Sequence, residues 1–275
     1  MNHHTDDVMC VRMSPDRATA VSGQTGNKPT IFTWDAETGE KKQRMKIAKG
    51  ARGIQSVAIN SEGWICAVDL HNEHQVYVYD NNGNCVFKQK GDTNKIHDVC
   101  WDNKPGSKRF SSAGVKHIYF WDASDASGDK KKGLFGKNEQ TSFACTAWDD
   151  NGKCYTGGSN SKIYVWGGDD GRQCERTLDG FHSKGFICAL RYVNGKLYSG
   201  GKDGKVNCID TSSMSVTNTI TFDSLVRAID CSDDGKMLVG LRNGTITMCS
   251  AAGDKMDIMN SHDNGEVWGL HNQNG

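Results

Sequence analysis

Alternating apolar and polar positions divide much of this chain into short strands. In residues 117–122, HIYFWD, Ile118 and Phe120 alternate with His117, Tyr119 and Trp121. This period of two, with large side chains at both sets of positions, is typical of a strand that is packed on both faces. A shorter strand precedes it at 109–113, across a tight turn at 114–116. The stretch therefore predicts a hairpin within an all-β protein.

The second strand of this hairpin recurs along the chain. Its other copies are TIFTWD at 30–35, VYVYD at 76–80, KIYVWG at 162–167, KVNCID at 205–210 and TITMCS at 245–250. The last residues of the six copies are 45, 42, 45, 43 and 40 residues apart. A period of about 40–45 residues with strands that end in Trp-Asp or a similar pair is typical of WD-repeat propeller blades. The sequence thus predicts an all-β WD-repeat propeller with six full blades.

The repeats predict one domain over residues 1–275, since each repeat can bury its apolar faces only against a neighbour. The expected repeats are residues 3–49, 50–91, 92–137, 138–181, 182–222 and 223–261. Residues 262–275 begin with HDNGEVWGL, which matches the first strand of a seventh, incomplete repeat. A blade that lacks three strands leaves exposed edges. We therefore expect either a fragment or a second chain that completes the seventh blade.

Composition narrows the class of protein further. The chain has 36% apolar residues, 24% charged residues and three prolines, as a globular protein does. Its 33 basic and 33 acidic residues cancel, so overall charge favours neither a nucleic acid nor a membrane as partner. Its eleven cysteines include no CxxC pair, which is typical of reduced, buried thiols in a cytoplasmic protein.

Several phrases are more specific than the repeat itself. They include HTDDV at 4–8, SGQTGNKPTIFTWD at 22–35, SAGVKHIYFWD at 112–122 and GLFGKNEQTSFACTAW at 133–148. In wording and order the phrases resemble the first propeller of the echinoderm microtubule-associated protein-like (EML) family. The resemblance implies a non-catalytic scaffold without a cofactor, which binds tubulin, microtubules or other axonemal proteins. It also implies a location in the cytoplasm and cytoskeleton or in the axoneme of a cilium.

A buried polar network is expected in each WD repeat, built from His, Ser or Thr, Asp and Trp side chains that must satisfy one another. The first repeat supplies His4, Ser22 and Trp34 but lacks the turn Asp. The fifth repeat has Cys208-Ile209 where the Trp would stand. The third and fourth repeats keep Trp121 and Trp166 without the matching His. We expect structural roles for the network residues of these four repeats, namely His4, Trp34, Trp121, Trp166, His182, Ser199 and Asp203.

Two basic runs are the candidate partner-binding residues. The first comprises Lys41, Lys42, Arg44 and Lys46 on an expected outer strand, followed by Lys49 and Arg52. The second comprises Lys130, Lys131, Lys132 and Lys137, in a segment at 123–140 that we interpret as an inserted loop without a packing role. Tubulin surfaces and tails are acidic, so such patches would attract them. Alternatively, outer-strand lysines only deter pairing between sheet edges.

The sequence gives little support to a metal site, a phosphate-binding loop or a catalytic serine. His71 and His74 lie in an expected turn, not on a helix that would aim both rings at one metal ion. The glycine-rich segments at 23–30 and 133–140 do not fit GxxxxGK[ST], and no GxSxG occurs. An enzyme is therefore not expected. The alternative function is a general WD-repeat adaptor for a regulatory complex, which an exposed apolar cluster would favour.

Overall fold

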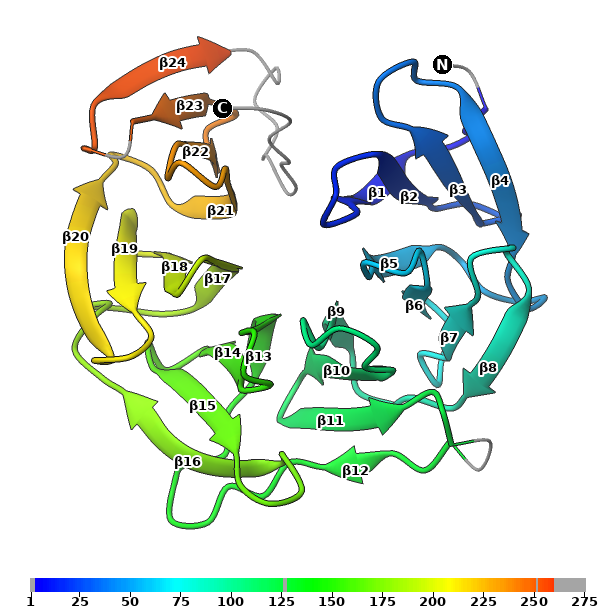
Figure 1. The fold of residues 1–275 in the computed structure, drawn as a ribbon, viewed down its shortest axis with the longest axis horizontal. Coiled ribbons are helices and arrows are strands. Elements are labelled where there is room, and N and C mark those ends of the chain that lie inside the picture. The colour runs from blue at the N-terminus through cyan, green and yellow to red at the C-terminus, as the bar shows by residue number, and fades with distance from the viewer. Residues whose placement is uncertain (1–2, 126–127, 251, 260–275) are drawn as a thin grey trace. The chain divides into compact units, whose positions relative to one another are not determined.

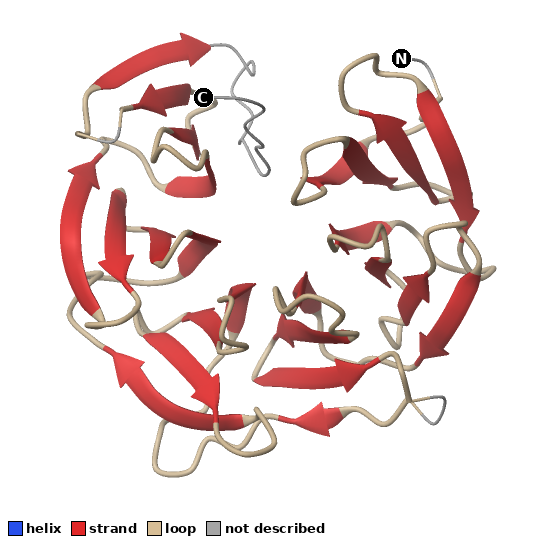
Figure 2. Cartoon of the chain, in the orientation of Figure 1, coloured by secondary structure: helices blue, strands red, loops and turns tan. Residues whose placement is uncertain are grey.

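The computed structural model describes residues 3–125, 128–250 and 252–259, and consists there of strands and loops (Figures 1 and 2). In those residues no helix is long and apolar enough to cross a membrane. The chain divides into two compact units, residues 1–132 and 133–275. The expected seventh repeat at 262–275 lies outside the described residues.

The first unit contains three antiparallel sheets of four strands, blades 1 to 3, each with its strands in chain order. Blade 1 is β1 (Val8–Met13), β2 (Thr19–Gln24), β3 (Thr30–Asp35) and β4 (Lys41–Lys46); blade 2 is β5 (Ile54–Ile59), β6 (Ile65–Asp69), β7 (Val76–Tyr79) and β8 (Cys85–Gln89); blade 3 is β9 (Ile96–Trp101), β10 (Arg109–Gly114), β11 (His117–Asp122) and β12 (Lys131–Lys132).

The described part of the second unit contains blades 4 to 6, built in the same way. Blade 4 is β13 (Phe143–Trp148), β14 (Cys154–Gly158), β15 (Ile163–Gly167) and β16 (Gln173–Leu178); blade 5 is β17 (Ile187–Val193), β18 (Lys196–Gly201), β19 (Lys205–Asp210) and β20 (Ser215–Thr221); blade 6 is β21 (Val226–Cys231), β22 (Met237–Leu241), β23 (Ile246–Cys249) and β24 (Lys255–Met259). The predicted all-β class with six four-stranded blades is thus confirmed. A single domain over 1–275 stays a prediction.

The strand registers align the blades position by position. In blade 1, Val11 pairs with Ser22, Ser22 with Phe32, and Phe32 with Arg44. The counterparts of Phe32 on the third strands are Tyr77, Tyr119, Tyr164, Asn207 and Thr247. The counterparts of Arg44 on the fourth strands are Lys88, Lys132, Thr177, Thr219 and Asp257. Any residue of one blade can therefore be compared with its equivalent in the others.

The core of each unit lies between successive blades. In the first unit the first strands β1, β5 and β9 are neighbours, and the fourth strands β4, β8 and β12 lie on the opposite side (Figure 1). Met45 on β4 is 1% exposed and packs with Ile65, Tyr77 and Tyr79 of blade 2. On β8, Phe87 repeats this contact against blade 3. In the first unit, β4 and β8 thus each place one large side chain against the next blade.

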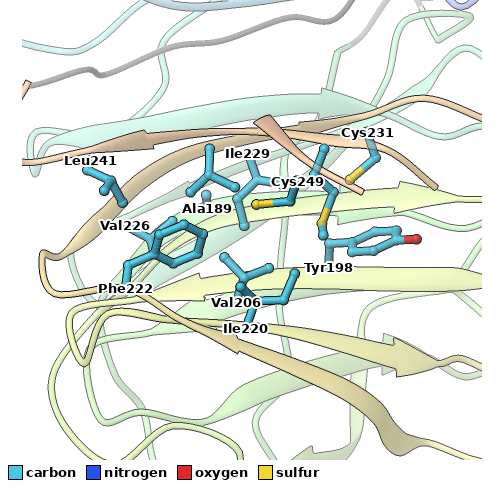
Figure 3. Close-up of a cluster of buried hydrophobic side chains, with 12 residues drawn as sticks. Ala189, Tyr198, Val206, Ile220, Phe222, Val226, Ile229, Cys231, Leu241 and Cys249 are labelled. Carbon is cyan, nitrogen blue, oxygen red and sulfur yellow. The ribbon is translucent and has the colours of Figure 1, made fainter. Parts of the chain in front are cut away.

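The second unit repeats this arrangement. Between blades 5 and 6, Val206 and Ile220 lie in one buried cluster with Met237, Val239 and Cys249 (Figure 3). Leu178 of β16 lies likewise in a buried cluster with side chains of blade 5. Successive blades are therefore joined by the same kind of apolar contact in both units.

Glycines on the second strands permit this close packing. A Cβ added to Gly23 would lie 2.6 Å from Ile54 Cβ, and one on Gly200 would lie 2.4 Å from Val226 Cγ1. Both glycines face the first strand of the next blade, and that strand's branched side chain fills the space. A larger residue at either position would push the two blades apart.

The interpretation of residues 123–140 as a loop without a packing role is wrong. Lys131 and Lys132 form β12, which pairs with Phe120 and Tyr119 of β11. Lys130 donates a hydrogen bond to the Gly91 carbonyl, and its Nζ lies 4.9 Å from the centre of the Tyr119 ring. The segment therefore supplies the outer strand of blade 3, although its sequence carries no apolar alternation that would have revealed a strand.

Met45→Ala tests the contact between blades. The substitution leaves a cavity between blades 1 and 2, so we expect it to lower the free energy of unfolding by about 2–5 kcal/mol. Arg44→Ala is the matched control, because the neighbouring side chain faces solvent and should cost about 0.5 kcal/mol or less. Urea unfolding followed by tryptophan fluorescence measures both. Equal losses would contradict the packing described here.

Candidate partner-binding surface

The polar network of blade 1 is complete, although the sequence lacks its turn Asp. Trp34 Nε1 donates to Ser22 Oγ at 2.7 Å, and Ser22 Oγ lies 2.7 Å from His4 Nε2. The other ring nitrogen, His4 Nδ1, lies 2.8 Å from Gln24 Oε1. Gln24 thus stands where an Asp was expected. Its place at the end of β2 was the signal that sequence reasoning missed.

Blade 5 contains the network with its Asp. His182 Nε2 lies 2.9 Å from Ser199 Oγ, and His182 Nδ1 lies 3.0 Å from Asp203 Oδ1. Burial alone would raise the pKa of Asp203, but hydrogen bonds from His182 and from the Ser183 backbone N–H hold that pKa below its usual value. Ile209 occupies the Trp position, and Asn207 donates to the Phe181 carbonyl at 2.7 Å.

Blades 3 and 4 keep the Trp without a His. Trp121 Nε1 donates to Ser112 Oγ at 2.9 Å, and Trp166 Nε1 donates to Thr156 Oγ1 at 2.8 Å. In blade 3, Asp92 precedes β9 by the same interval as His4 precedes β1. Its carboxylate accepts a hydrogen bond from Tyr119 Oη at 2.7 Å.

In blade 4 an aromatic side chain takes the place of the His. The Phe135 ring lies 5.1 Å from the Trp166 ring at 86°, as the His4 ring lies 5.8 Å from that of Trp34. Phe135 also stacks on Phe143, with ring centres 6.1 Å apart. It precedes β13 by eight residues, not four, so the repeat spacing gave no sign of this role.

The backbone beside Phe135 is joined to the outer strand of blade 4. Leu134 N donates to the Arg172 carbonyl at 2.9 Å, and the Leu134 carbonyl accepts from Cys174 N at 2.8 Å. Asn138 Nδ2 donates to the Cys174 carbonyl at 3.3 Å. Residues 134–138 therefore pack with blade 4, whereas the predicted third repeat extends to residue 137.

The first basic run lies on β4 and just beyond it. Lys41, Lys42, Arg44 and Lys46 are all exposed, and Lys42 Nζ forms an ion pair with Asp35 at 3.1 Å. Beyond the strand, Lys49 is exposed as well. Arg52 is instead held to blade 2, since it donates to the Leu70 carbonyl at 3.2 Å and to Asn72 Oδ1 at 3.4 Å.

The second basic run divides into parts with different surroundings. Lys131 and Lys132 are exposed on β12, and Lys130 is held by Gly91 and Tyr119 as described above. Lys137 is exposed on the segment that packs with blade 4, so it belongs to the second unit. The structure therefore places Lys131 and Lys132 on the outer strand of blade 3, Lys130 directly before it and Lys137 in the second unit.

Charge on the fourth strands differs between the two units. The strands β4, β8 and β12 together carry seven basic and no acidic side chains. The strands β16, β20 and β24 together carry two basic and two acidic side chains. One member of the basic set, Lys88, was missed because it stands apart from both runs in the sequence. Only the strand register places it with them.

Lysines of the first unit lie over aromatic rings of the third strands. Lys41 Nζ lies 5.9 Å from the Phe32 ring centre, and Lys88 Nζ lies 5.8 Å from that of Tyr77. The contact of Lys130 with Tyr119 repeats this pairing in blade 3. Such cation–π contacts limit the motion of the side chains and hold the charges on a defined surface.

The described residues contain no group of three His, Cys, Asp or Glu side chains placed to hold a metal ion. At the turn that carries His71 and His74, the Asp69 carboxylate accepts hydrogen bonds from Tyr77 Oη at 2.9 Å and from two backbone N–H groups. Asp69 therefore holds the backbone of this turn in place through these hydrogen bonds.

The fold is that of the WD-repeat propellers. Two solved structures share it across 98% of this chain: the WD40 repeats of RRP9, with a TM-score of 0.79 and 15% identity over 85% of that chain, and the Cps50 (Swd1) propeller of Myceliophteria thermophila, with a TM-score of 0.81 and 11% identity over 91% of that chain. The profile of the family described as "Echinoderm microtubule-associated protein first beta-propeller" matches residues 2–249. The chain belongs to this family.

Two relatives resemble this chain over almost all of its length. The "Ciliary WD repeat-containing protein ctxp80" of Euplotoides octocarinatus is 41% identical over 98% of this chain and 37% of its own length. The human "Echinoderm microtubule-associated protein-like 1" is 28% identical over 97% of this chain and 34% of its own length. The chain thus spans little more than a third of either relative.

Asp203→Asn tests the network of blade 5. Because the pKa of Asp203 is lowered in the fold, its ionised form stabilises the protein above the usual Asp pKa of about 3.9, and this stabilisation is lost as the pH falls through the lowered value. We expect a loss of about 1–3 kcal/mol at pH 7 that shrinks below about pH 4. Unfolding from pH 7 to pH 3 measures it. The exposed Asp223→Asn is the control, and a loss independent of pH would contradict the expectation.

Phe135→Ala tests the aromatic contact with Trp166. The half-buried ring should contribute about 1.5–3 kcal/mol to the free energy of unfolding. Leu134→Ala changes the neighbouring side chain, which is 43% exposed, and should have a much smaller effect. Thermal unfolding compares the two variants, and an equal effect of both would show that Phe135 does not serve as part of blade 4.

Proposed function

We propose that this protein is a non-catalytic scaffold of the EML type, which binds microtubules or an axonemal complex through the outer strands of its first unit. It would then act in the cytoplasm and cytoskeleton or in the axoneme of a cilium. Its partners would be tubulin or other axonemal proteins. The family membership and the ciliary relative support this class of partner.

The observation that carries the proposal is the one-sided charge of the fourth strands. Seven basic and no acidic side chains on β4, β8 and β12 give the first unit a cationic side, even though the whole chain has no net charge. Tubulin surfaces are acidic, so this side would attract them at low ionic strength and release them as salt screens the charges.

Co-pelleting with microtubules tests the proposal. We expect the protein to pellet with microtubules at low salt, and the variant Lys46→Glu/Lys131→Glu to bind about tenfold more weakly. Both lysines are exposed on fourth strands, so the fold should persist. Lys184→Glu/Lys202→Glu makes the same change of charge at exposed positions of the second unit and should bind as the parent does.

Failure of the parent protein to pellet at low salt would rule out direct microtubule binding. The general adaptor function would then be favoured, with a regulatory complex as partner. Equal weakening of both variants would show that binding depends on overall charge and not on the outer strands of the first unit.

A further inference from the structure

One register position distinguishes the two units more sharply than the total charge does. On the fourth strands, the residue opposite the third-strand aromatic is Arg44 in blade 1, Lys88 in blade 2 and Lys132 in blade 3. The equivalent residues in blades 4 to 6 are Thr177, Thr219 and Asp257. Each blade of the first unit therefore carries a cation at the same place, and each described blade of the second unit does not.

These three cations form a row, which we call the cation row. All three side chains are exposed. The strands that carry them, β4, β8 and β12, follow one another along one side of the first unit (Figure 1). The blades are also linked here, because Gln43 of β4 donates to the Asn81 carbonyl of blade 2 at 2.8 Å. The row therefore carries one charge per blade, and the first two of these blades are hydrogen-bonded to each other beside it.

The chemistry of this surface fits a polyanion better than a folded apolar partner. Across β4, β8 and β12 the one large apolar side chain that is strongly exposed is Val86, at 48%. Stable interfaces between folded proteins bury an apolar centre as well as charges. The cation row offers charges along a line, which a flexible chain can follow from blade to blade.

Among polyanions, a peptide fits better than a nucleic acid. Single-stranded nucleic acids bind through aromatic rings on which the bases stack. Two of the three rings opposite the cation row are covered, since Phe32 is 4% exposed and Tyr77 is 2% exposed, and the third ring, of Tyr119, is partly buried. Carboxylates need only the exposed basic groups, and the guanidinium of Arg44 can bind one in bidentate fashion.

We propose that an extended peptide rich in glutamate or aspartate lies along β4, β8 and β12, with its carboxylates on Arg44, Lys88 and Lys132. This inference rests on the proposed function and names the part of the partner that is recognised, an acidic flexible segment. Each exposed ion pair contributes little alone. Binding at one blade raises the local concentration of the peptide at the next, so the three pairs act together.

Fluorescence anisotropy with a labelled peptide of twenty glutamates tests this inference on the full chain at low salt. The parent should bind the peptide, with affinity that falls as salt rises. The variant Arg44→Gln/Lys88→Gln/Lys132→Gln should bind at least tenfold more weakly. The matched control is Arg176→Gln/Lys184→Gln/Lys202→Gln, which removes three exposed charges from the second unit and should change affinity less than twofold.

Two outcomes of this experiment would overturn the inference. One is an equal loss of peptide affinity in both triple variants, which would show that binding depends on the overall charge of the protein and not on the cation row. The other is tighter binding of a single-stranded oligonucleotide of equal charge than of the glutamate peptide. Circular dichroism and thermal unfolding establish that both variants remain folded.

Microtubules with and without their acidic tails separate the inference from the proposed function. If the parent protein pellets with intact microtubules but only weakly with microtubules that lack their tails, the result supports the proposed function and the acidic-peptide inference together. Equal pelleting with both kinds would retain the proposed function and overturn the tail as the recognised segment. If the peptide binds at the cation row but microtubules do not, the acidic-peptide site stands and the proposed function fails.

Discussion

The close approach of successive blades is the constraint on which the rest of the structure depends. Ile54 fills the space that Gly23 leaves, and Val226 does the same at Gly200, so β5 and β21 lie close against the sheets that precede them. At the other end of the sheet, a fourth strand needs only one large apolar anchor such as Met45. Once the anchor is buried, the neighbouring side chains of that strand face solvent, and the fold sets no condition on their chemistry beyond strand propensity.

The interior polar groups obey a different condition. A buried hydroxyl, imidazole or carboxylate is costly unless it is hydrogen-bonded, so each network must be completed by whatever side chain can reach it. Blade 1 uses Gln24 where blade 5 uses Asp203. In blade 4 there is no imidazole at this place, and the ring of Phe135 packs against Trp166. The polar groups of blades 1 and 5 are hydrogen-bonded to one another within each blade.

The repeat period and the family could be predicted from the sequence, because the third strands recur every 40–45 residues and two of them, at 30–35 and 117–122, keep the Trp-Asp ending. The same reasoning placed His4 and His182 in the right positions. It missed Gln24 because only an Asp in the following turn was considered for that role, and it missed Phe135 because this residue precedes β13 by eight residues instead of four. Lys130 was expected in a loop without a packing role, whereas its Nζ lies 4.9 Å from the centre of the Tyr119 ring. Lys88 became visible only when the registers of the blades were compared, because pairing across strands, not proximity in sequence, places it beside Arg44 and Lys132.

The two readings of the outer-strand lysines are compatible. Charge on a fourth strand deters another sheet edge from pairing with it, because a second backbone could approach only by desolvating those charges. An acidic peptide that binds through its side chains meets no such barrier, since its carboxylates neutralise the same charges without using the backbone edge. The lysines above Phe32 and Tyr77 have already lost part of their freedom, so binding immobilises them at lower cost. The same lysines therefore deter another sheet edge from pairing with the fourth strand and allow an acidic peptide to bind through its side chains.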